Sequence, residues 1–376
     1  MDPSGNKPRD LGGSLPVPNV QDLAARPAAE LTPAILHRYL RGADAPAFSS
    51  TTTIFRDNDN TSSSSSVPVV DLARLLDPAH ADEEAGRLRA ACEDWGFFHV
   101  ANHGVPGHVI NDVKDDIEAF FNLPLAEKNG MAAQGSSGIE GYGQAFVVSD
   151  EQKLDWADML FLATLPPEYR SLNLWPTKPA TFRTSLERYS VEVQRVAADL
   201  LRAMARNLGV AEEKMMSIAA AQTVRINYYP PCPQAHDQVL GLSPHSDAVG
   251  LTLLLQVSQV PGLQIRKEGK WIPVDPVPGA LVANVGDVVE MLTNGRYKSI
   301  EHRAVVNACH ERVSVAAFHS AKFGATYGPM EEIVGAAGDG EAPRYRTIGA
   351  EDYVKLLLSS KLEGKNIMDA MKINPL

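Results

Sequence analysis

The sequence predicts a mainly β fold with flanking helices, in which a β-rich core follows a helical N-terminal layer. After Thr223, short β-like runs alternate with Gly, Pro and Asn, which indicates a sandwich or a barrel closed on itself, a jelly roll being one option. Before that point, apolar residues between 185 and 208 recur every three or four positions, which predicts a long helix. These patterns divide the chain into segments 1–66, 67–221, 222–330 and 331–376.

The composition excludes several classes of function. The 376 residues are 44% apolar and can bury a large core, and no apolar run approaches the length of a membrane span. A formal net charge of −11 without a basic run argues against a nucleic-acid partner. The start has no signal-peptide character, and three scattered cysteines fit a reducing compartment. We expect a cytoplasmic protein, taken to be a monomer, that binds neither membranes nor nucleic acid.

Residues 1–66 form an N-terminal extension rich in Pro, Ser, Thr, Asp and Asn, and the Ser-rich run at 61–66 predicts a flexible linker. Within the extension, residues 20–23 and 35–40 can form a strand-like or helical patch that docks on the body. Regular structure is expected from Val67 onward.

Strands and helices alternate in the α/β region 67–221. β-like runs at 67–72 and 97–100 flank a helical stretch at 83–95, and the turn Asn102-His103-Gly104 ends the second run. Together with the helix at 185–208, this region is expected to form a mostly helical layer that supports the core.

The core segment 222–330 contains β-like runs at 223–229, 251–255, 262–266, 271–274 and 280–285. Glu268-Gly269-Lys270 predicts a hairpin turn between the third and fourth of these runs. Helical periodicity returns at 352–357, in the C-terminal helical segment 331–376.

Two metal-competent side chains, His245 and Asp247, lie two residues apart in the core, so on a strand both would project from the same face. A third, His302, comes from another β-like run at 299–306. Two imidazoles and one carboxylate leave open positions on the opposite side of an ion, as in non-haem iron(II) oxygenases that bind a cosubstrate and dioxygen together. We therefore predict a catalytic iron site formed by His245, Asp247 and His302.

Arg312 and Ser314 follow ten and twelve residues after His302, and strand alternation places both on one face with Ala316 and Phe318. A guanidinium can hold a carboxylate through two parallel hydrogen bonds, and a serine hydroxyl adds a third. This pair suits the far carboxylate of 2-oxoglutarate.

Upstream, Arg225, Asn227 and Tyr229 also share one face, and burying these three polar groups together argues for a polar ligand between them. A single H-x-D pair carries little weight, because the chain has another at His80 and Asp82 in a helix-like or loop-like segment. The specific signal is the ordered set of H-x-D, His and R-x-S on β-patterned sequence, preceded by N-x-Y.

In these motifs the chain resembles the plant soluble 2-oxoglutarate- and iron(II)-dependent dioxygenases, from roughly residue 15 to residue 372. The resemblance includes the runs 67–72, 91–98 and 102–105, and Asn-Tyr-Tyr-Pro-Pro-Cys at 227–232. Leu-Asp-Trp-Ala-Asp-Met at 154–159 and Leu-Trp-Pro at 174–176 are similar to the branch that contains senescence-related and norcoclaurine-synthase-like dioxygenases.

The resemblance implies a distorted double-stranded β-helix as the catalytic core, with iron(II) on the three predicted ligands. It implies that 2-oxoglutarate is held by Arg312, Ser314 and Tyr229, with Asn227 near its metal-binding end. It also implies that the substrate pocket is lined by Tyr142, Arg225 and Phe318, together with the C-terminal helix. The implied reaction is oxidation, by default hydroxylation, of a small aromatic, indolic, alkaloid or terpenoid plant metabolite, with release of succinate and carbon dioxide and with ascorbate as reductant.

Two alternatives stay open at this point. An oxidase of the ethylene-forming type shares the metal residues but uses ascorbate in place of 2-oxoglutarate. A metabolite-binding protein that kept the fold and lost turnover is the other, although the complete set of metal ligands argues against it.

Overall fold

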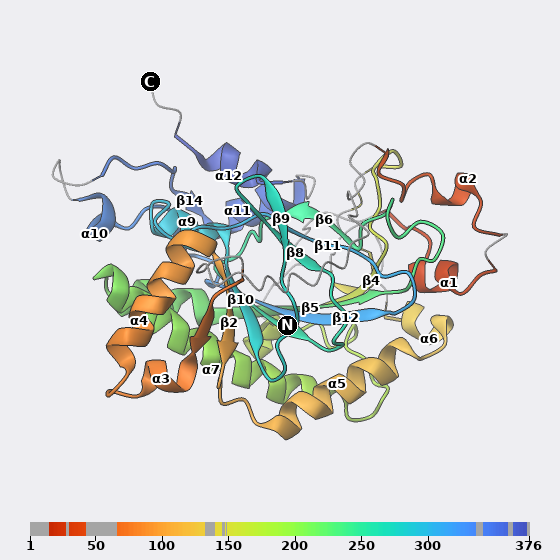
Figure 1. The fold of residues 1–376 in the computed structure, drawn as a ribbon, viewed down its shortest axis with the longest axis horizontal. Coiled ribbons are helices and arrows are strands. Elements are labelled where there is room, and N and C mark those ends of the chain that lie inside the picture. The colour runs from red at the N-terminus through yellow and green to blue at the C-terminus, as the bar shows by residue number, and fades with distance from the viewer. Residues whose placement is uncertain are drawn as a thin grey trace, which may run out of the picture.

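Two β-sheets form the centre of the computed structural model, which describes residues 15–27, 30–42, 66–131, 140–144, 147, 149–335, 341–359 and 364–373. The larger sheet has eight strands in the order β1-β2-β10-β7-β12-β5-β4-β3, and the smaller has four in the order β6-β11-β8-β9. Helices cover the side of the larger sheet that faces away from the smaller one (Figure 1). The predicted jelly-roll arrangement is confirmed in its open form, because the two sheets do not close into a barrel.

The larger sheet is antiparallel except for the parallel pair β1–β2. Its strands are β1 (Val69–Asp71), β2 (Phe97–Ala101), β3 (Gly141–Gly143), β4 (Asp158–Leu165), β5 (Ala221–Tyr229), β7 (Leu251–Gln256), β10 (Leu281–Val285) and β12 (Arg312–Ser320). The smaller sheet consists of β6 (Leu242–His245), β8 (Leu263–Lys267), β9 (Lys270–Pro273) and β11 (His302–Ala304). A separate short pair consists of β13 (Thr326–Tyr327) and β14 (Ile348–Gly349).

The helices before the core are α1 (Val20–Ala24), α2 (Pro33–Leu36), α3 (Leu72–Leu76), α4 (Ala81–Ala90), the π-helical turn η3 (Ala91–Trp95), α5 (Gly107–Phe121), α6 (Leu125–Asn129), η4 (Pro167–Tyr169), α7 (Phe182–Leu208), α8 (Glu212–Met216) and η5 (Ser217–Ala220). Those after β10 are α9 (Asp287–Leu292), α10 (Glu331–Val334), α11 (Ala350–Ser359) and α12 (Asn366–Met371). Within the described ranges, none of these helices is both long enough and apolar enough to cross a bilayer.

The predicted long helix is α7, which packs on the helix-covered side of the larger sheet and contacts β4, β7 and β12. Its apolar stripe is buried, with Leu186, Val193 and Leu200 fully inaccessible to solvent. The helix ends at Gly209, whose φ of 68° gives the left-handed conformation that caps helices and favours glycine.

The β-like runs predicted at 67–72 and 97–100 in region 67–221 are confirmed as β1 and β2, and the region also supplies β3 and β4 to the larger sheet. Strand β4 was not predicted from the sequence. Its residues run from Met159 to Leu165 almost without a polar side chain, and a continuous apolar run does not distinguish a buried strand from a buried helix.

The N-terminal extension docks on the body as helices. The N–H groups of Val20 and Gln21, at the start of α1, donate to the Asp158 carboxylate at 3.0 and 2.7 Å. Tyr39 packs edge-on against Trp156 with ring centroids 5.2 Å apart. The expectation of a docked patch is therefore met, whereas most of the Ser-rich linker, residues 61–65, lies outside the described residues.

Because one face of α7 packs on the sheet and the other is exposed, substitutions on the two faces should differ in their effect on the free energy of unfolding. Leu200→Ala should lower the free energy of unfolding by about 2–5 kcal/mol, because it removes buried apolar contacts and leaves a cavity. Val191, on the same helix, is 55% exposed, so Val191→Ala should change the free energy by less than about 0.5 kcal/mol. Denaturant unfolding measures both, and equal effects of the two substitutions would contradict this packing.

Candidate active site

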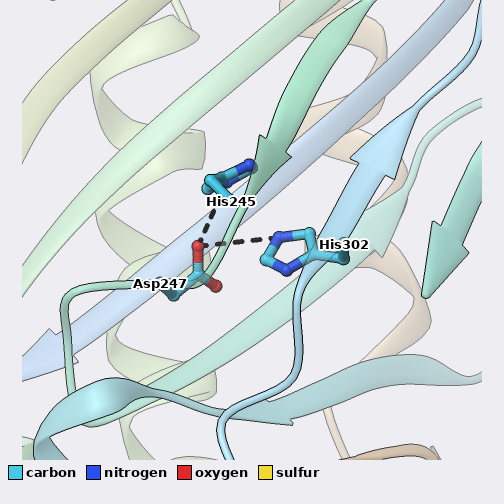
Figure 2. A group of neighbouring side chains, drawn as sticks. All are labelled: His245, Asp247 and His302. Atoms are coloured by element: carbon cyan, nitrogen blue, oxygen red, sulfur yellow. Dashed lines mark ion pairs between the residues drawn. The ribbon is translucent and has the colours of Figure 1, made fainter. Parts of the chain in front are cut away.

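Three side chains converge between the two sheets (Figure 2). His245 ends β6 and His302 begins β11, and the two residues are paired directly across these antiparallel strands. Nε2 of His245 lies 3.5 Å and Nε2 of His302 lies 3.6 Å from Oδ1 of Asp247. All three residues are buried, and their candidate ligand atoms lie within 4.8 Å of one another. This spacing fits one metal ion.

Asp247 reaches the group in a way that strand alternation does not describe. β6 ends at His245, so Asp247 lies in the following loop rather than on a shared strand face. The loop is fixed by a hydrogen bond from the backbone N–H of Asp287, at the start of α9, to the Asp247 carbonyl at 2.8 Å. The predicted trio is therefore brought together, although the expectation that His245 and Asp247 share one strand was wrong.

The imidazoles are oriented by backbone carbonyls. Nδ1 of His245 lies 2.8 Å from the Ser243 carbonyl, and Nδ1 of His302 lies 3.3 Å from the Ile300 carbonyl. Because a carbonyl can only accept, each Nδ1 carries a hydrogen, and Nε2 is the ring atom of each histidine that faces Asp247 Oδ1. Burial, reinforced by His245, lowers the pKa of His302 to about 4, so this ring is neutral near pH 7.

The two oxygens of Asp247 have different partners. Oδ2 accepts hydrogen bonds from Thr252 Oγ1 at 2.6 Å and from Asn284 Nδ2 at 2.7 Å, while Oδ1 faces the imidazoles. Burial alone would raise the pKa of Asp247, but the imidazoles and the Thr252 hydroxyl outweigh it and hold the pKa below its ordinary value. The carboxylate therefore stays ionised, and it faces the imidazoles with one anionic oxygen.

A second polar group lies on the inner face of the larger sheet. In the β5–β12 pair, Arg312 is opposite Tyr229 and Ser314 is opposite Asn227, so these four side chains share one face. All four are at most 4% exposed. The same face carries Thr252 and Asn284 on the neighbouring strands, which connects this group to the Asp247 carboxylate.

The Arg312 guanidinium is buried without a counter-ion from the described part of the chain. Its Nη2 donates to the neutral amide of Gln256 at 3.2 Å, and its Cζ lies 5.2 Å from the Tyr229 ring centroid. Its Nε has no hydrogen-bond partner among the described residues. Burial lowers the pKa of Arg312, which reflects the cost of keeping this charge out of water. The unfilled donors fit an incoming carboxylate.

Two glycines leave room for these residues. A Cβ at Gly262 would lie 2.8 Å from the Val305 carbonyl and 2.9 Å from Cδ of Arg312, and a Cβ at Gly241 would lie 2.6 Å from the Tyr229 ring. Neither glycine has an unusual backbone angle that would explain it, so close approach is the reason that only glycine fits.

The predicted substrate residues divide into two groups. Arg225 lies opposite Phe161 in β4 and Ala316 in β12, on the face that carries Arg312, and Phe318 lies on the same face with its ring 6.4 Å from that of Phe161. Arg225, Phe161 and Phe318 are all half-buried, and Arg225 Nε has no partner among the described residues.

Tyr142, by contrast, is not brought to this face. In β3 it pairs with Leu160, which turns it toward the helical side, where it contacts Phe120 and Phe121. Its hydroxyl accepts a hydrogen bond from Asn19 of the N-terminal extension at 2.6 Å. The structure therefore contradicts the placement of Tyr142 in the substrate pocket.

Comparison with known proteins identifies the class. A family model described as the 2OG-Fe(II) oxygenase superfamily matches residues 220–321, and one described as the N-terminal region of non-haem dioxygenases in morphine synthesis matches residues 67–178. The fold and site are thus those of an iron(II) oxygenase. More particularly, the chain belongs to the plant 2-oxoglutarate- and iron(II)-dependent dioxygenases, and it is an oxidoreductase with iron and 2-oxoglutarate as its cofactors.

Individual relatives support this assignment along nearly the whole chain. S-norcoclaurine synthase 1 of Coptis japonica is 47% identical over 363 residues, which is 96% of this chain and 98% of the relative. Oxoglutarate-dependent flavonoid 7-O-demethylase 1 of Ocimum basilicum is 44% identical over 366 residues, 96% and 93% of the two chains. A crystal structure of JOX2 in complex with 2OG, Fe and JA is 33% identical, with a TM-score of 0.82 over 96% of this chain and 98% of that one.

Thr252, Asn284 and Gln256, which hydrogen-bond to Asp247 and Arg312, were not predicted from the sequence as site residues. Each is a polar residue within or at the end of an otherwise apolar strand run, and that was the available signal. A buried polar side chain in such a run needs a partner, but the sequence does not say which.

The bond from Thr252 predicts a measurable role in metal binding. Thr252→Val removes one of two donors to Asp247 Oδ2 with little change in shape, so affinity for a divalent ion should fall about tenfold or more. Titration of the metal-free protein with Co(II) against a chelator measures this. Thr326→Val, at an exposed strand position, is the matched control. Equal affinity of the two variants would contradict the inferred role of Thr252.

Proposed function

We propose that His245, Asp247 and His302 hold the iron(II) ion, and that Arg312, Ser314 and Tyr229 hold the far carboxylate of 2-oxoglutarate, with Asn227 near its metal-binding end. The carrying observation is the buried Arg312, which has unused donors and no carboxylate partner in the described residues. A dicarboxylate supplies the missing negative charge, and bidentate pairing suits a guanidinium.

Bound iron(II), with 2-oxoglutarate and dioxygen, supplies the oxidation of the substrate and releases succinate and carbon dioxide. The chain contributes the rest. His245, Asp247 and His302 would hold the ion, and a set of only three protein ligands would leave it able to bind the cosubstrate as well. Thr252 and Asn284 fix the orientation of the Asp247 carboxylate, and the buried residues of the β5–β12 pair keep water away from the cosubstrate. Ascorbate is the proposed reductant.

The proposed substrate is a small plant metabolite with an apolar or aromatic body and an acidic or strongly polar group. Phe161 and Phe318 offer apolar walls, and the half-buried Arg225 beside them lacks an acidic partner in the described residues. Among the similar proteins, two are named for norcoclaurine and for a flavonoid, and a third was solved in complex with JA, so a small metabolite is a consistent choice of substrate. The family comparison favours neither the ascorbate-dependent oxidase nor the silent binding protein.

The proposal includes a cytoplasmic location and a monomeric state. Supporting the first, all three cysteines are free, and Cys92 and Cys232 are buried away from oxidants. Fractionation of plant cells tests the location, and light scattering of the purified protein tests the monomer.

Oxidation should depend on Asp247. Incubation of the purified protein with iron(II), ascorbate, 2-oxoglutarate and a plant metabolite extract should yield products that mass spectrometry finds changed by one oxygen or one methyl group. Asp247→Ala should abolish these products because the remaining two ligands hold the ion weakly. Glu83→Ala, which removes an exposed carboxylate on α4, is the control and should keep them. Unchanged turnover in Asp247→Ala would refute the metal assignment.

Arg312 should govern affinity for the cosubstrate. Arg312→Met should raise the KM for 2-oxoglutarate about 100-fold, the equivalent of about 2.7 kcal/mol, because it removes a charge-assisted bidentate contact.

A second variant tests the role of the Arg312 guanidinium while leaving the arginine in place. Gln256→Glu places a carboxylate where the amide now lies, 3.2 Å from Nη2 of Arg312, and should compete with 2-oxoglutarate for the guanidinium. Its KM should also rise steeply while the protein stays folded. Saturation curves for 2-oxoglutarate that match those of the unaltered protein in both variants would exclude this carboxylate site.

A further inference from the structure

The C-terminal segment 364–373 returns to β6 beside the first metal-binding imidazole. The N–H of Gly364 donates to the Pro244 carbonyl at 2.9 Å, and the N–H of Ser246 donates to the Gly364 carbonyl at 3.1 Å. Gly364 thus forms a parallel bridge with His245. These bonds engage the residues on either side of His245, so the C-terminal backbone helps to set where that side chain lies.

The next residue, Lys365, reaches the segment that carries the second imidazole. Its Nζ lies 2.9 Å from Glu290 Oε2 and 2.7 Å from the Ser299 carbonyl. The same Glu290 oxygen accepts the Ser299 N–H at 2.6 Å. The ion pair therefore binds both backbone polar groups of Ser299, three residues before His302. Ile300, between them, supplies the carbonyl that orients His302.

The third ligand is connected through α9, which carries Glu290. Asp287, at the start of this helix, donates its N–H to the Asp247 carbonyl at 2.8 Å. Glu290 is 8% exposed, and its other oxygen accepts a hydrogen bond from Tyr345 at 2.7 Å. Figure 1 shows α12, which directly follows Lys365, on the same side of the molecule as α9.

A buried carboxylate needs a counter-ion, and Lys365 is the cation that Glu290 has in the described residues. Loss of the lysine would leave Glu290 charged among the backbone groups of Ser299, and the least costly response is for this segment to open toward water. Such a movement would change the spacing of His245 and His302, because one ion pair holds the neighbours of both.

We propose that Lys365 and Glu290 are positioning residues of the metal centre, and that the C-terminal segment is part of its scaffold. Neither side chain touches the metal. The pair acts on Ser299 and on the docking of Gly364, and through them on the two imidazoles. This inference rests on the proposed function, since it assumes that the trio holds the metal.

The first test measures metal affinity rather than turnover. Lys365→Met should weaken Co(II) binding to the metal-free protein about tenfold or more, a loss of the size seen when groups that orient metal ligands are removed. The titration is made at a temperature where circular dichroism shows the variant fully folded, so that lower stability alone does not change the result. Lys365→Arg, which keeps the charge, should restore most of the affinity.

The matched control is Lys355→Met. Lys355 also lies in the C-terminal part and pairs with an acid, Asp352, at 2.8 Å, but both side chains are mostly exposed. A pair of this kind contributes little, so Co(II) affinity should not change.

A second variant probes the docking of the segment without altering a charge. Gly364 has a φ of +57°, and a Cβ there would meet no atom within 4 Å, so Gly364→Ala adds backbone strain and no clash. It should weaken Co(II) binding in the same direction as Lys365→Met. Folded Lys365→Met or Gly364→Ala protein that binds Co(II) as tightly as the unaltered chain would overturn the inference. Failure of the unaltered chain to bind Co(II) or iron(II) would instead refute the proposed function.

Discussion

The Asp247 carboxylate connects the two sheets, and the arrangement of the site depends on it. One oxygen accepts hydrogen bonds from Thr252 in β7 and Asn284 in β10 of the larger sheet, and the other faces the imidazoles on β6 and β11 of the smaller sheet. A buried carboxylate is costly unless its lone pairs are used. The separation of the sheets at this point is therefore constrained by the partners of one side chain, and the loop after β6 must hold it between them.

The site contains two buried charges, on Arg312 and Asp247, that neighbouring side chains compensate only in part. Arg312 is 2% exposed, yet the described residues around it offer a neutral amide and an aromatic ring rather than an acid. The imidazoles that face Asp247 include one, His302, that burial keeps neutral. The protein thus leaves one anion and one cation without full compensation. A metal ion would neutralise the anion, and a dicarboxylate would neutralise the cation. Binding of these ligands would relieve the electrostatic cost of the two buried charges, and this relief would add to the binding free energy.

The sequence predicted those parts of the site that depend on local alternation. Arg312, Ser314, Asn227 and Tyr229 share a face because β5 and β12 are regular strands with period-2 patterns. Contacts between residues far apart in the sequence were not predictable in this way. Asp247 is positioned by a hydrogen bond from a residue forty positions away, and the partners of Asp247 and Arg312 lie on other strands. Tyr142 was misplaced because its face follows from pairing with β4, a strand whose apolar run gives no periodic signal.

The two arginines on the inner face of the larger sheet, Arg312 and Arg225, differ in how deeply they are buried. Arg312 lies on β12 between β5 and β7, with Gly262 close to its side chain, and is 2% exposed. Arg225 is half-buried where β4 meets β5, beside two half-buried aromatic rings. A cation in a more open position is better solvated and tolerates more ligand shapes. If Arg225, Phe161 and Phe318 line the substrate pocket as proposed, replacing either phenylalanine would change which substrate fits without disturbing Arg312 and the residues around it.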